Sequence, residues 1–169
     1  METTVKLYSL SYKDVKTYLF ALLFIAGNIL LPQLCHLVPG GGLTWLPIYF
    51  FTLIAAYKYG IRVGLLTAIL SPLVNNILFG MPPVSALPIL LIKSSLLAVS
   101  ASYIAHKIGK VTILGILLAV LAYQVVGVGV EWVMENSFFV AVQDFRIGIP
   151  GMLVQIVGGF FLLKAIAKV

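Results

Sequence analysis

Residues 84–110 have the sequence VSALPILLIKSSLLAVSASYIAHKIGK, in which the long apolar segment 84–106 is interrupted by a single lysine, Lys93. A helix of roughly 20 apolar residues is long enough to cross the hydrocarbon core of a bilayer. Lys107 and Lys110 follow the segment directly. Because cytoplasmic loops of membrane proteins are enriched in lysine and arginine, we expect this end of the segment to face the cytoplasm.

The same pattern of apolar segments separated by turns recurs along the chain. It predicts about six membrane-spanning helices, at residues 17–38, 43–58, 63–79, 84–106, 111–134 and 149–167. The outer turns would be residues 39–42, 80–83 and 135–148. Nearly all cations then lie on one side: Lys6, Lys13, Lys16, Lys58, Arg62, Lys107, Lys110, Lys164 and Lys168. This distribution predicts that both termini are cytoplasmic.

Composition excludes a soluble domain. The chain is 62% hydrophobic and 9% charged, which leaves too few polar groups to cover a water-exposed surface. We therefore predict an all-α integral membrane protein, with residues 1–169 forming a single transmembrane domain and residues 1–16 lying at the inner membrane interface. The net charge of +6 follows from the inner lysines and favours contact with anionic lipid rather than nucleic acid.

Charged and polar residues within the spans are the candidates for a binding site. Lys93 lies deep in its span, where an unpaired charge is costly unless it faces a cavity or a partner. Gln124, Glu131 and Glu135 are spaced seven and four residues apart, so they share one face of a helix. Two interpretations remain open for Lys93: it faces a ligand cavity, or it forms a purely structural pair with Glu131. Glu135 is either part of this polar stripe or solvated at the outer interface.

Uncharged polar and aromatic residues extend the candidate set. Asn76 and Gln155 are possible ligand contacts, but interhelical hydrogen bonding is the default role for such residues, as it is for Asn28. A further group of aromatic residues is predicted near the outer face: Trp45, Tyr49 and Trp132. They would either belong to an interfacial aromatic belt or form the walls of a pocket for a flat ring.

No catalytic or metal-binding pattern is recognisable. His36 and His106 are predicted on opposite sides of the membrane, so neither has a serine and an acid arranged for acyl transfer. Neither histidine has metal-ligand spacing, and Cys35 is the only cysteine. We therefore expect no enzymatic activity and no cofactor.

Several short motifs follow one another through the second to fourth spans. They are Leu46-Pro47, residues 55–60 (AAYKYG), 64–66 (GLL), 70–73 (LSPL) and 80–83 (GMPP), Leu87-Pro88 and Lys93. In these motifs, and in its length and number of spans, the chain resembles the substrate-binding S components of energy-coupling factor (ECF) transporters. One feature differs from that family: its A-x-x-x-A docking motif in the first helix is absent, since Ala21 and Ala26 are five residues apart.

The resemblance implies a subunit in a prokaryotic cell membrane that captures an extracellular vitamin or related micronutrient. Its partners would be a transmembrane coupling subunit and two cytoplasmic ATPase subunits. A pocket with Lys93, Glu131 and aromatic residues would suit a small aromatic or zwitterionic ligand. The alternatives are an autonomous transporter or channel for small solutes, or a membrane assembly protein without enzymatic activity.

Overall fold

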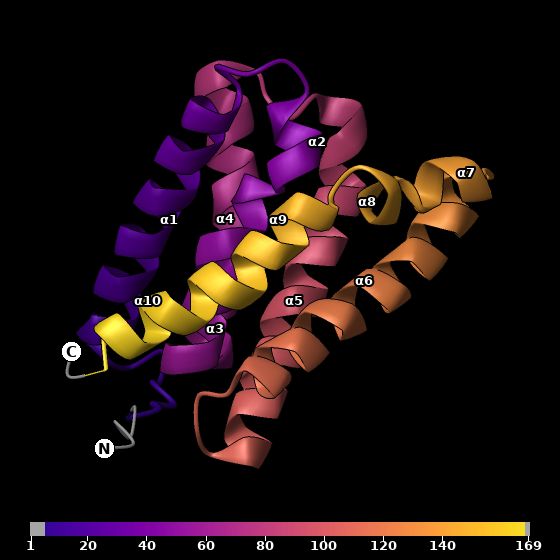
Figure 1. The fold of residues 1–169 in the computed structure, drawn as a ribbon. Helices are drawn as coiled ribbons and strands as arrows, with labels where there is room; N and C mark the ends of the chain where they lie inside the picture. The colour runs from indigo at the N-terminus through magenta and orange to yellow at the C-terminus, as the bar shows by residue number, and fades with distance from the viewer. Residues whose placement is uncertain (1–5, 168–169) are drawn as a thin grey trace.

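The computed structural model describes residues 6–167, and these residues form helices and turns without any strand (Figure 1). Four helices are long and apolar enough to cross a membrane: α1 (Val15–Cys35), α4 (Ile61–Phe79), α5 (Leu87–Ile108, extended by the short 3₁₀ helix η2, Val84–Ala86) and α6 (Ile113–Glu135). The protein is thus a helical membrane protein. Lys168, which is predicted at the inner side, and residues 1–5 of the predicted interfacial segment lie outside the described residues.

The predicted span at residues 43–58 is not one continuous helix. This region consists of α2 (Gly41–Trp45), the 3₁₀ helix η1 (Pro47–Tyr49) and α3 (Phe50–Tyr59). Leu46 separates α2 from η1 in a left-handed conformation, with φ of 46°. Pro47 explains the break, because a proline disfavours the α conformation in the residue before it and cannot donate a helical hydrogen bond.

The last predicted span, residues 149–167, is also irregular. Its helix runs over residues 149–165 as α9 (Ile149–Leu153), the π-helical segment η3 (Val154–Gly158) and α10 (Gly159–Ala165). It is shorter than the four long helices, so the count of six crossings stays a prediction. Two single-turn helices, α7 (Phe138–Ala141) and α8 (Gln143–Arg146), occupy the loop before it.

The described part of the N-terminal segment packs against the end of α3 and the start of α4. The Tyr8 and Leu10 amides donate hydrogen bonds to the carbonyls of Lys58 and Tyr59, at 2.7 and 3.3 Å. The Arg62 guanidinium donates to the Leu10 carbonyl at 3.0 Å. The first two hydrogen bonds satisfy carbonyls at the C-terminal end of α3, where a helix has no internal partners left.

Helix α3 is the centre of the bundle, and its residues 52–59 are all buried. Asn28 of α1 holds the start of this helix. Its side-chain oxygen accepts a hydrogen bond from the Phe51 amide (3.2 Å), and its amide donates to Thr52 (3.0 Å) and to Ser71 of α4 (3.2 Å). The prediction that Asn28 joins helices by hydrogen bonds is confirmed.

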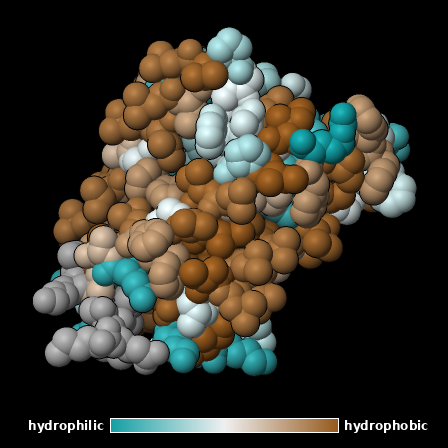
Figure 2. Space-filling view, in the orientation of Figure 1, coloured by the Kyte–Doolittle hydropathy of each residue, from teal (hydrophilic) through white to brown (hydrophobic). Residues whose placement is uncertain are grey.

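The outer surface of the bundle is predominantly apolar, with hydrophilic groups gathered toward its ends (Figure 2). On α1 alone, five leucines are exposed: Leu19, Leu22, Leu23, Leu30 and Leu34. Exposed leucines in such numbers fit contact with lipid rather than with water.

The ends of the bundle differ in charge. The α3–α4 junction carries Lys58 and Arg62, the turn between α5 and α6 carries Lys107 and Lys110, and Lys164 lies near the end of α10. These three places lie toward the lower end of the molecule in Figure 1, whereas α2, α7 and α8 lie toward the upper end. The fold therefore gathers the basic turns at one end of the bundle.

Candidate functional site

A cavity of about 340 Å³ opens at the end of the bundle opposite the basic turns. Its walls come from the C-terminal part of α1, α2 and η1, the turn between α4 and η2, the first turns of α5, the end of α6, and α8. Most of the lining is apolar, and includes Leu43, Leu46, Ile48, Ile89, Leu90 and four prolines. This volume falls at the lower end of the range for small-molecule sites.

One wall of the cavity carries three buried charges. The Lys93 ammonium of α5 lies 2.9 Å from Asp144 Oδ2 of α8 and also contacts Glu131 Oε2 of α6. Lys93 and Glu131 are each 3% exposed, and Asp144 is 5% exposed. These three side chains, here called the charge triad, join α5, α6 and the loop that follows α6.

Gly127 provides the space that the lysine needs. A Cβ atom at this position of α6 would lie 2.9 Å from Cγ of Lys93, closer than real Cβ atoms approach. The lysine stem can therefore lie flat against α6 and extend toward Glu131, one helical turn further along. Gln143 supports the same wall, since its side-chain amide donates a hydrogen bond to Glu131 Oε1 at 3.4 Å.

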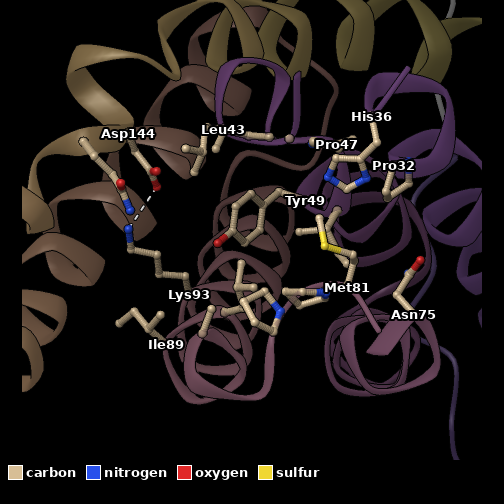
Figure 3. Close-up of a pocket in the computed structure, with 18 of the residues that line it drawn as sticks. Pro32, His36, Leu43, Pro47, Tyr49, Asn75, Met81, Ile89, Lys93 and Asp144 are labelled. Atoms are coloured by element: carbon tan, nitrogen blue, oxygen red, sulfur yellow. Dashed lines mark hydrogen bonds and ion pairs between the residues drawn. The ribbon is translucent and has the colours of Figure 1, made fainter. Parts of the chain in front are cut away.

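Tyr49 separates this wall from the opposite one (Figure 3). Its ring packs on Tyr123 with centroids 5.3 Å apart. Across from the triad lie Pro32, His36, Met81 and Asn75. The Asn75 amide already donates to the carbonyls of Asn28 (2.8 Å) and Ser71 (2.9 Å), so the orientation of Asn75 is fixed.

The structure brings together three of the eight predicted site residues: Lys93, Glu131 and Tyr49 all line the cavity. Their role in binding stays a prediction. The geometry agrees with both interpretations of Lys93, because its side chain lines the cavity and also forms an ion pair with Glu131. The pairing involves Asp144 as well as Glu131. Glu135 is exposed at the end of α6, one helical turn beyond Glu131.

The other five predicted residues lie elsewhere. Gln124 and Gln155 are fully buried below the cavity, where both hydrogen-bond to the Tyr123 hydroxyl, at 3.0 and 3.2 Å. Asn76 donates to the Pro82 carbonyl at 2.8 Å and holds the turn after α4, whereas its neighbour Asn75 lines the cavity. Trp45 and Trp132 are exposed, and Trp132 packs edge-on against Phe138. None of the five lines the cavity.

Asp144, His36 and Asn75 line the cavity but are not among the residues predicted from the sequence. Asp144 and Arg146 both belong to the predicted outer turn at residues 135–148, but only Arg146 is exposed, with its guanidinium 3.7 Å from the centre of the Phe139 ring. The sequence gives no signal for Asp144, because Lys93 and Glu131 alone would already form a neutral pair.

The cavity offers apolar surface and three buried charged groups to a small molecule. The Lys93 amine is held by two carboxylates, and no nucleophile is paired with a general base among the cavity residues. Within residues 6–167, no group of three His, Cys, Asp or Glu side chains could hold a metal ion. Comparison with known proteins found no matching family model, no matching curated protein and no matching solved structure.

Proposed function

We propose that this chain is the substrate-binding subunit of an ECF-type uptake transporter for a small micronutrient. The observation that supports this most strongly is the cavity itself: it is of ligand size, largely apolar, and carries buried charges on one wall. Charges buried within membrane helices are costly and usually serve a substrate or a partner.

The proposed orientation places the cavity on the extracellular side. The basic turns at the opposite end of the bundle then lie in the cytoplasm, in agreement with the distribution of lysine and arginine in membrane proteins. Both termini would be cytoplasmic, and the two irregular segments, α2 to α3 and α9 to α10, would complete six crossings.

Transport would require partners. The chain has no phosphate-binding loop with a Walker lysine, and its helices fill nearly all of residues 15–165. We therefore propose that a transmembrane coupling subunit and two cytoplasmic ATPase subunits supply the energy, in the membrane of a prokaryotic cell. The sequence motifs through the second to fourth predicted spans support this assignment.

Affinity purification from membranes of the source cell, followed by reconstitution in liposomes, tests the proposal. The tagged protein should co-purify with a membrane subunit and with ATPases, and should accumulate solute only when these partners and internal ATP are present. Sustained accumulation by the purified chain alone would instead establish an autonomous transporter. Purification without any ATPase would remove the basis for the ECF assignment.

A further inference from the structure

We propose that the cavity selects ligands that carry a positive charge, in particular a ring compound with an ammonium or amidinium group. This inference rests on the proposed function, since it concerns the ligand of the same cavity. It follows from the balance of charges on the cavity wall.

The charge triad has one more negative charge than it can neutralise internally. Lys93 supplies one positive charge, whereas Glu131 and Asp144 supply two negative charges. In the part of the chain that the structure describes, no second Lys, Arg or His lies within ion-pair distance of either carboxylate. Arg146 is close in sequence but exposed and stacked on Phe139.

An excess carboxylate charge is costly where water is scarce. Both acids are almost fully buried, and the wall around them is mainly apolar. A carboxylate in such surroundings is stabilised by an added cation or hydrogen-bond donor. Besides its contact with Lys93, Glu131 accepts one long hydrogen bond, from Gln143 at 3.4 Å. Among the described residues, Asp144 accepts a side-chain hydrogen bond from Lys93 and from no other residue.

The excess charge faces the cavity rather than the protein interior. Glu131, Asp144 and Lys93 all belong to its lining, so a ligand inside it can approach both acids. The adjoining surface is the ring of Tyr49, and prolines and aliphatic side chains form most of the remainder. An apolar, flat body with a cationic end complements this combination. A cation near the face of Tyr49 would gain further attraction from the aromatic ring.

An anionic ligand is the opposing possibility. It would have to displace Glu131 or Asp144 from Lys93 and would leave the displaced carboxylate buried without a partner. Such an exchange adds a negative charge to a wall that already has an excess of one. The geometry therefore favours a cation over an anion of the same shape.

Three single-ring probes of similar size test the inference: benzylammonium, benzyl alcohol and benzoate. Binding to the detergent-purified full chain is measured by isothermal titration and by the shift in thermal unfolding. We expect benzylammonium to bind at least about tenfold more tightly than benzyl alcohol, since a hydrogen bond to a charged group is worth that much or more. Benzoate should bind most weakly.

Asp144→Asn removes the excess charge and should bring the affinities for benzylammonium and benzyl alcohol close together. Glu131→Gln serves as a second variant with the same expected result if Asp144→Asn fails to fold. The matched control is Glu135→Gln, which neutralises an exposed acid on the same helix as Glu131 and should keep the preference of the unchanged protein.

A preference for benzoate, equal binding of all three probes, or binding of none would overturn the inference. A preference for benzylammonium that persists in both neutralised variants would overturn it as well. These outcomes are distinct from failure of the proposed function: the charge preference is measured on the isolated chain, whereas the ECF assignment depends on co-purifying ATPases and ATP-driven uptake.

Discussion

At the scale of single residues, the charge triad couples three elements, and its members should depend on one another. Lys93→Met would leave two buried carboxylates without a counter-ion, so we expect it to lower the free energy of unfolding by about 3 to 5 kcal/mol. The double variant Lys93→Met with Glu131→Gln should recover only part of this loss, because Asp144 remains unpaired. Adding Asp144→Asn should restore most of it.

Denaturant unfolding of the four proteins in detergent, followed by circular dichroism, provides the measurement. Full recovery in the double variant would show that Asp144 is not part of the coupled group. The contrast between the double and the triple variant therefore separates a pair from a triad.

The sequence identifies part of this site and misses the rest for a physical reason. Lys93 and Glu131 are conspicuous because charges within apolar helices are expensive. Asp144 lies in a polar loop, where acids are usually solvated, but in the structure it is buried and paired with Lys93 of α5. Gln124 and Gln155 point into the bundle, as predicted. Helical periodicity does not specify how far along the bundle axis a residue lies, and both glutamines lie below the cavity.

At the scale of helices, close approach of α3 and α4 depends on Gly64. A Cβ atom there would lie 2.8 Å from Cα of Ala56, a backbone atom that cannot move aside. We expect Gly64→Ala to destabilise the protein by about 1 to 3 kcal/mol, the usual cost of overpacking. Gly129 of α6 is the matched control, since an added Cβ atom would meet nothing within 4 Å.

Gly129→Ala should be neutral or slightly stabilising, by up to about 1 kcal/mol, because alanine is the better helix former. Thermal unfolding in detergent compares the two variants. Equal effects of both substitutions would indicate that helix propensity, rather than contact between α3 and α4, determines the result.

The long helices are the most predictable elements. Unbroken apolar sequence predicts α1, α4, α5 and α6 to within a few residues at most ends. The failures occur where backbone geometry overrides hydropathy. Pro47 divides the predicted second span. A proline at this position is by itself a signal for a helix break, and hydropathy does not register it. The π-helical segment in the last span has no comparable signal, because its residues are as apolar as those of a regular helix.

At the scale of the whole molecule, the proposed orientation can be tested by labelling with a membrane-impermeant thiol reagent. In a Cys35→Ser background, Val84→Cys places a thiol beside the cavity, at a position that is 72% exposed. We expect it to react in intact cells. Lys110→Cys, in the turn between α5 and α6, should react only after the membrane is permeabilised, and the reverse result would invert the orientation.

The central claim is that the cavity holds a small molecule, and native mass spectrometry of the purified protein tests it most directly. Ala86→Trp would fill the cavity from its lining, whereas Val84→Trp adds the same ring to the exposed side of the same short helix. We expect a stoichiometric small-molecule adduct on the unchanged protein and on Val84→Trp, and its loss from Ala86→Trp. An adduct that persists in a folded Ala86→Trp variant, or no adduct on the unchanged protein when it is purified from its source membranes, would contradict the account.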